Sequence, residues 1–150
     1  MPGVAPEPAT SAPLLKLVAD RSIGVLATLK RDGRPQLSNV TYAFDPATSL
    51  VRVSVTDGRA KTANVRRDPR VSLHVSSEDM WSYVVVEGTA RLSPVAQAPD
   101  DEVVDQLVDQ YRAAAGEHPD WAEFRAAMVA DRRLLLSFSV EHSYGWSGGS

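Results

Sequence analysis

Two basic side chains at a junction between strand-like segments could bind an anion. Arg59 and Lys61 lie in DGRAKTANVRRDP, residues 57–69, between two alternating apolar runs. This segment is long enough for about two helical turns, and both side chains would lie in the first turn. The helix dipole is already positive there and backbone N–H groups are unpaired, so each cation costs about 0.3 to 1 kcal/mol without an anion. Phosphate is the usual occupant of such a site. The alternative is that both side chains extend into solvent.

The two ends of this predicted helix differ in role. Asp57 or Gly58 is expected near the N-cap, and the Asp-Pro pair at 68–69 ends the helix. Arg66 and Arg67 would lie in the last turn, where positive charge suits the dipole, so we expect both to be structural. If Asp57 does not cap the helix, its carboxylate would oppose anion binding.

The elements that position this junction are mostly strands. Apolar residues show strand-like patterns, bounded by turn residues, over residues 22–29, 35–44, 50–56, 70–76, 81–92 and 134–140. A short helix is expected over 14–20, and two more in the late insertion at 98–133, the first ending near Gly116. Trp121, Phe124 and Met128 of the second are assigned to packing. Six or seven strands with late helices predict a mainly β (α+β) fold, an antiparallel barrel with helical decoration.

Two of the predicted strands are apolar on both faces. Val84, Val85 and Val86 are adjacent, and Leu134 to Leu136 repeat the feature. A barrel strand turns only one face inward, so the second face needs another cover. Because two such strands compete for two short helices, we expect a homodimer in which sheet packs on sheet.

Composition limits the function classes. The 150 residues are 43% hydrophobic, which fits one domain. A net charge of -3 argues against nucleic-acid or anionic-membrane partners, and no apolar run approaches the roughly 20 residues needed to span a bilayer. The absence of cysteine suits a cytoplasmic protein. We expect a disordered, dispensable proline-rich leader at 1–12, one domain at 13–146 and a flexible tail at 147–150.

No catalytic acid or base can be assigned from the sequence. His74, His118 and His142 are isolated and lack metal-ligand spacing, so they are expected to be structural or exposed, and no metal site is expected. Motifs for a nucleophilic serine, a P-loop or a dinucleotide fold are absent. The catalytic residues therefore stay unknown.

Three motifs carry a resemblance to a known family. They are G-R-P-Q-L-S-N at 33–39, R-A-K-T-x-N with R-R-D-P-R at 59–70, and W-S-Y at 81–83. With them, nearly all of residues 14–146 resembles the pyridoxamine 5'-phosphate oxidase-like split-barrel family, and most closely its actinobacterial branch that binds coenzyme F-420, an 8-hydroxy-5-deazaflavin. The resemblance implies an antiparallel split β-barrel and a homodimer whose two cofactor sites lie at the subunit interface.

The resemblance also implies a set of cofactor-binding residues. Arg59 and Lys61 would hold the phosphate, with the backbone of Ala60 between them, and Ser54 would reach the phosphate or ribityl chain. The remaining contacts would come from Gln36, Ser38 and Asn39, which would line the ring and ribityl chain, and from Trp81 of the partner chain. The alternatives are ordinary strand positions for the polar residues and interface packing for Trp81. Lys30, Arg31 and Arg34 are candidates for the oligoglutamate tail of F-420.

The function that the resemblance implies is hydride transfer. An F-420-dependent reductase would pass a hydride to a small, electron-poor, unsaturated substrate, and the cofactor supplies the reactive carbon, so no protein acid or base is required. Two alternatives stay open: an FMN-dependent oxidase or reductase on the same fold, and a carrier or storage protein for F-420 without a substrate.

Overall fold

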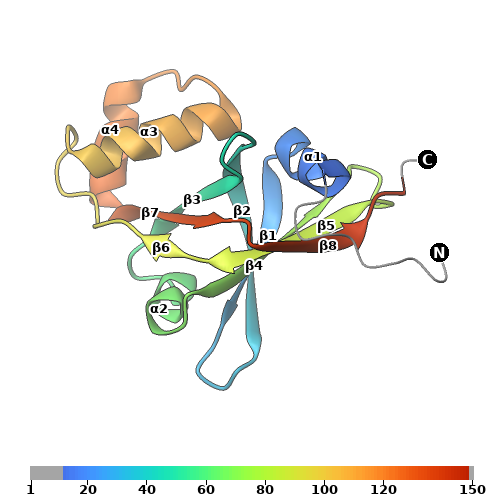
Figure 1. Ribbon diagram of the computed structural model, residues 1–150. Helices are drawn as coiled ribbons and strands as arrows, with labels where there is room; N and C mark the ends of the chain where they lie inside the picture. The colour runs from blue at the N-terminus through green and yellow to red at the C-terminus, as the bar shows by residue number, and fades with distance from the viewer. Residues whose placement is uncertain (1–11, 149–150) are drawn as a thin grey trace.

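The computed structural model describes residues 12–148, in which eight antiparallel strands form one curled sheet (Figure 1). The strands run in the order β6-β7-β3-β2-β1-β4-β5-β8. Their bounds are β1 (Ile23–Leu29), β2 (Pro35–Asp45), β3 (Leu50–Thr56), β4 (Arg70–Ser76), β5 (Tyr83–Thr89), β6 (Arg91–Leu92), β7 (Arg133–Ser139) and β8 (His142–Trp146). The strands β5 and β7 are also in contact, although they are not neighbours in the sheet, so the sheet curls on itself. The predicted α+β antiparallel barrel is therefore confirmed.

Four helices decorate this half-barrel: α1 (Ala12–Asp20), α2 (Ala60–Arg67), α3 (Glu102–Ala115) and α4 (Trp121–Ala130). The helix α1 begins one residue inside the predicted leader, whose other residues lie outside the described range. As predicted, α3 stops at Gly116, whose φ of 88° suits glycine. At the other end of the chain, the Gly148 N–H donates to Ser82 Oγ at 3.0 Å.

Two strand predictions differ from the structure. The expected strand 81–92 is divided at Ala90 into β5 and β6, and Trp81 precedes it rather than heading it. The strand β8 was not predicted, because only Ser143 of its residues is buried and the apolar alternation that marks a strand is missing there.

The inner face of the sheet holds the main core. Leu26, Tyr42, Leu73 and Leu136 lie in it at no more than 1% exposure, together with residues of α1. The Tyr42 hydroxyl donates to the carbonyl oxygen of Val18 at 2.6 Å, which fastens α1 across the barrel. This burial gives the domain its stability.

The outer face of the sheet has two different halves. Over β3 and β7, the helices α3 and α4 pack on Leu135 and form a second apolar cluster with it. The other half lies over β1, β4, β5 and β8. The strand pairing puts one residue of each strand side by side on this face: Val25, His74, Val85 and Tyr144. Large apolar side chains are exposed on that half and, at Leu37, on the adjoining start of β2. We call them the outer apolar face: Ile23, Leu37, Tyr83, Tyr144 and Trp146.

Candidate functional site

Helix α2 is fastened to the strands by two buried polar side chains of the R-A-K-T-x-N motif. The Thr62 hydroxyl donates to the carbonyl oxygen of Thr56 at 2.7 Å. The Asn64 side-chain amide donates to Thr28 Oγ1 and to Gln36 Oε1, both at 3.1 Å. A buried hydrogen bond of this kind is costly to leave unmade, so these residues fix where α2 begins. Within residues 12–148, no hydrogen bond or ion pair engages the side chains of Arg59 and Lys61.

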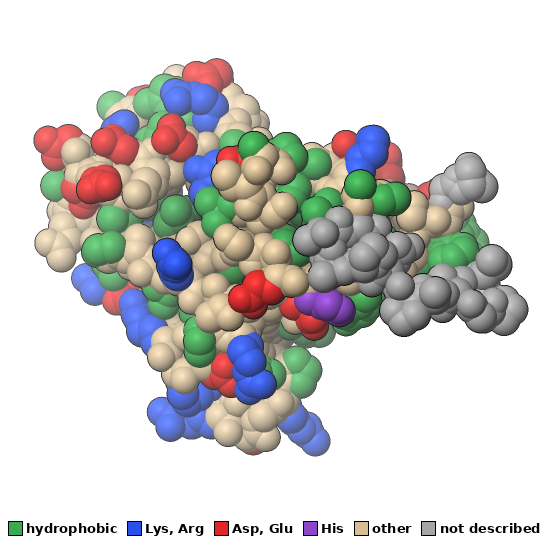
Figure 2. All heavy atoms as spheres, in the orientation of Figure 1, with side chains coloured by type: hydrophobic (Ala, Val, Ile, Leu, Met, Phe, Trp, Pro, Cys, Tyr) green, Lys and Arg blue, Asp and Glu red, His purple; other side chains and the backbone are tan. Residues whose placement is uncertain are grey.

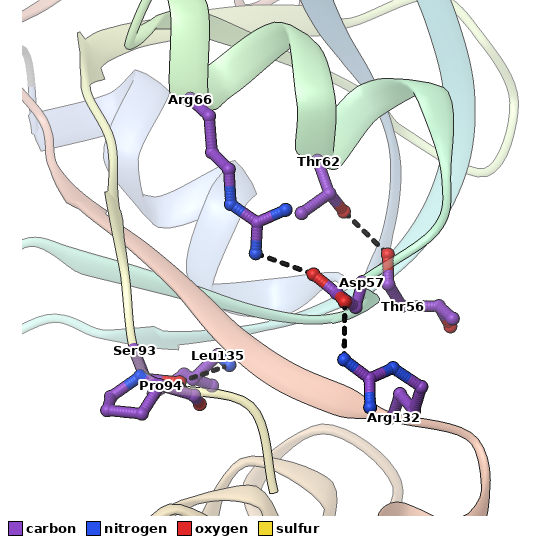
Figure 3. A network of polar contacts seen from close by, with 8 residues as sticks. All are labelled: Thr56, Asp57, Thr62, Arg66, Ser93, Pro94, Arg132 and Leu135. Carbon is purple, nitrogen blue, oxygen red and sulfur yellow. Dashed lines mark hydrogen bonds and ion pairs between the residues drawn. The ribbon is translucent and has the colours of Figure 1, made fainter.

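The start of α2 differs from the prediction. Its N-cap is Arg59, directly after the expected Asp57 or Gly58, in an extended conformation and without a side-chain capping bond, so Asp57 does not cap the helix. Asp57 instead accepts from Arg66 Nη2 at 2.7 Å and from Arg132 Nη2 at 2.9 Å (Figure 3). The hydrogen bonds from Arg132 and Arg66 lower the pKa of the Asp57 carboxyl. With two guanidinium partners, this carboxylate does not oppose an anion at the helix start.

Three cations meet beside this helix start. Arg59, Lys61 and Arg133 line one cavity of about 570 Å³, and no Asp or Glu is among its lining residues. Burial, followed by the charges of Arg59 and Arg133, lowers the pKa of the Lys61 ammonium. Positive charges brought together and partly desolvated in this way favour a bound anion. These residues fit a phosphate group.

Arg133 strengthens this assignment, although it was not singled out from the sequence. Its Nη1 lies 3.4 Å from the carbonyl oxygen and 3.5 Å from the hydroxyl of Ser54. Its Nε is buried, and no hydrogen-bond partner for it is found among the described residues. Arg21 Nε, away from the cavity, is in the same state, so the case for Arg133 rests on its place in the cavity lining. No local pattern marks Arg133, because only the pairing of β7 with β3 brings it beside Ser54.

The cavity lies on the outer face of β2 and β3, between α2 and the α3–α4 hairpin. Asn39 and Ser54, both predicted site residues, line it together with Thr41 and Thr56. On β2, Asn39 and Thr41 pair with Val25 and Ile23 of β1, so the cavity borders the outer apolar face. Short hydrogen-bonding side chains therefore lead from the cations to the exposed sheet.

Two other predicted residues point elsewhere. Gln36 and Ser38 pair with Thr28 and Leu26 on β1, on the inner face of the sheet. Gln36 accepts the Asn64 bond described above, which makes it part of the attachment of α2. Because neighbouring strand residues alternate faces, Ser38 and Asn39 cannot both face the cavity. The structure brings only Asn39 of these three to the cavity.

The last two predicted residues lie at the borders of the site. Ala60 is the first residue of α2 and lines a shallow groove with Lys30, Arg31 and Arg67. Trp81 is 77% exposed in the loop between β4 and β5 and does not line the cavity of its own chain.

The Trp81 loop is held in a defined turn. Asp79 Oδ1 accepts from the Ser77 hydroxyl at 2.7 Å and from the Trp81 backbone N–H at 3.0 Å. These two bonds lower the pKa of the Asp79 carboxyl. An ordered turn thus presents a large aromatic side chain to solvent.

Arg67 is structural, and its replacement tests this. Its Nη2 donates to the carbonyl oxygen of Leu29 at 2.6 Å and to Asn64 Oδ1 at 3.0 Å. We expect Arg67→Ala to lower the free energy of unfolding by about 1 kcal/mol and to leave phosphate and cofactor affinity unchanged. Denaturant unfolding and a binding titration measure both. Weaker binding with unchanged stability would instead place Arg67 in the anion site.

The three histidines lie outside the cavity. His74 stacks on Tyr83, His118 contacts Tyr111 and Trp121, and His142 Nδ1 lies 3.1 Å from Glu87 Oε1. Within residues 12–148, no group of three His, Cys, Asp or Glu side chains could hold a metal ion. No helix in this range is long and apolar enough to cross a membrane.

Comparison with known proteins identifies the class. The family model described as pyridoxamine 5'-phosphate oxidase matches residues 12–147. The chain therefore belongs to the pyridoxamine 5'-phosphate oxidase-like split-barrel family.

Individual proteins of known sequence or structure are also similar to this chain. An F420H(2)-dependent biliverdin reductase from Mycobacterium tuberculosis (strain CDC 1551 / Oshkosh) is 31% identical over 131 residues, which cover 87% of this chain and 84% of that protein. Among solved structures, a conserved hypothetical protein from Mycobacterium tuberculosis has a TM-score of 0.69 at 21% identity, covering 92% of this chain and 84% of that one. An F420 reductase has a TM-score of 0.58 at 23% identity, covering 85% and 93%. The two structures support the fold.

Proposed function

We propose that this protein is an F-420-dependent reductase. The observation that supports this most is the cluster of Arg59, Lys61 and Arg133, which line one cavity without an Asp or Glu beside them. Burial and the charges of the two arginines lower the pKa of Lys61, and a bound phosphate would offset this repulsion. The similarity to an F420H(2)-dependent reductase favours F-420 over FMN as the bearer of that phosphate.

The chain's own residues bind and orient in this proposal. The cations hold the phosphate, Ser54 and Asn39 offer hydrogen bonds along the cavity, and the α3–α4 hairpin forms one wall of it. The deazaflavin, when bound, supplies a hydride that, with one solvent proton, reduces a conjugated double bond by two electrons. No protein acid or base is required for this chemistry.

The acidic tail of F-420 has a suitable exit. Lys30 and Arg31 line the groove beside Ala60, together with Asp32, and Arg34 lies in the same β1–β2 hairpin. Lys and Arg side chains gather over α2 and this hairpin, whereas acidic side chains gather over α3 and α4 (Figure 2). We propose that the tail leaves the cavity on the α2 side.

We also propose that a second copy of the chain completes the site. The outer apolar face is exposed in one chain, and sheets of this kind are covered when they pack face to face. Its borders suit a cofactor site, since Asn39 and Thr41 connect it to the cavity. Trp81, held out by the Asp79 turn, would then reach the cavity of the partner chain and flank the ring.

The similarity to the biliverdin reductase also suggests which class of molecule accepts the hydride. That protein is named for biliverdin, a linear conjugated tetrapyrrole, so we propose a conjugated double bond as the reduced group and biliverdin as the first acceptor to assay.

Turnover tests this function. Reduced F-420 is mixed anaerobically with the protein, an acceptor is added, and oxidised F-420 is followed by its absorbance. We expect oxidation with biliverdin or with another conjugated acceptor such as a quinone or enone. Tight binding of F-420 without oxidation by any of them would indicate the carrier alternative.

A further inference from the structure

The cavity beside α2 has two chemically different ends. Its charged lining residues come from α2 and the start of β7, at one end. The other end is lined by the α3–α4 hairpin through Tyr111, Ala114, Ala115, Phe124 and Met128. Phe124 and Met128 belong to the second apolar cluster, as their assignment to packing predicted, yet both also border the cavity.

The basic residues of the hairpin are already engaged. Arg112 Nε donates to Glu117 Oε2 at 2.7 Å, and its guanidinium lies 4.8 Å from the centre of the Trp121 ring. Arg125 Nη1 contacts Asp105 Oδ1 at 2.9 Å. Neither lines the cavity. An anionic group would therefore find no cation at this end, which is suited to an uncharged, apolar part of a ligand.

The wall is also held by packing and hydrogen bonds. Tyr111 packs against Trp121 and Phe124 with ring-centre distances of 5.8 and 5.0 Å. Gln110 Nε2 lies 3.3 Å from the carbonyl oxygens of Thr41 and Arg52, which joins α3 to β2 and β3. Small residues at 114 and 115 leave space between this aromatic wall and the strands.

We propose that the hairpin end of the cavity is the acceptor subsite and that Ala114 sets its size. This deepens the proposed function and rests on it. The phosphate of the cofactor occupies the cationic end and its acidic tail leaves along α2, so the apolar end is left for the substrate. The part of the acceptor seated there is a flat, conjugated and uncharged group. Any carboxylates of the acceptor lie outside this end.

The chain offers a matched set of variants. Ala114 is half-buried and lines the cavity, Ala115 is exposed and lines it, and Ala113 is exposed on the same helix without lining it. We expect Ala114→Leu to raise the KM for biliverdin by about tenfold or more, the effect of a few methylene groups in a closed pocket. The Kd for F-420 should change by less than about twofold, and Ala113→Leu should change neither value.

A direct binding measurement separates this inference from the proposed function. Biliverdin is titrated into the cofactor-free protein and followed by its own absorbance, and Ala114→Leu should weaken this binding even if no turnover with F-420 occurs. Thermal melting checks that the variant is folded; if it is not, Ala115→Leu carries the test. The inference is overturned if both variants leave acceptor binding and KM unchanged, if the unmodified protein binds no acceptor, or if the leucine instead weakens F-420.

Discussion

Lys61→Ala is expected to weaken F-420 binding by about 10- to 150-fold and to leave the cofactor-free protein as stable as before. Removal of one partner from a charge-assisted phosphate contact has an effect of this size. The folded chain disfavours the charged lysine, because burial and the neighbouring Arg59 and Arg133 lower its pKa. Alanine removes this repulsion and has the higher helix propensity, so the folded state loses nothing.

Binding titrations and thermal melts of the variants test this together. Arg59→Ala should act in the same way as Lys61→Ala. Arg67→Ala serves as the control, because it should lower stability and leave F-420 affinity unchanged. If Lys61→Ala keeps full affinity and melts at a clearly lower temperature, Lys61 is structural and the junction does not bind the phosphate.

Leu37→Glu is expected to convert the proposed dimer into a monomer and to abolish tight cofactor binding. The Leu37 side chain is 66% exposed in the single chain, so a charge costs little there. Inside an apolar interface, an unpaired carboxylate would cost several kcal/mol. The cofactor site then loses the residues that the partner contributes.

Sedimentation at micromolar concentration measures the first effect, and titration with F-420 measures the second. The control is Ala122→Glu, which places the same charge on the exposed side of α4. The shared-site account is wrong if the unmodified protein is a monomer, or if Leu37→Glu binds F-420 as tightly as Ala122→Glu does.

Much of the fold could be predicted because its signals are local. Val51, Val53 and Val55 alternate on one strand, and that period marks a half-buried strand wherever it occurs. The strand β8 lacked this signal, since its aromatic residues are exposed on the outer apolar face. The two-faced strands differ in the structure. Leu135 of β7 lies under α3 and α4. Val85 of β5 is already buried in the single chain, and the expected cover of the neighbouring exposed residues by a second chain stays a prediction.

The site was only partly predictable. The first-turn argument found Arg59 and Lys61, and the structure places both at one cavity. The role of Asp57 could not be predicted, because its carboxylate pairs with Arg66 and Arg132, which lie 9 and 75 positions away in the sequence. Gln36, Ser38 and Asn39 were taken together from their motif, although alternation separates them between the two faces. Arg133 and the hairpin wall depend on tertiary contacts that no local pattern encodes.

The measurement that tests the central claim most directly is an equilibrium titration of the unmodified protein with F-420 and, separately, with FMN, followed by cofactor fluorescence. The account predicts saturable F-420 binding that is tighter than FMN binding, weakens as salt is added, and is competed by inorganic phosphate at high concentration. Tighter binding of FMN, or no binding of F-420 by the intact dimer, would contradict it.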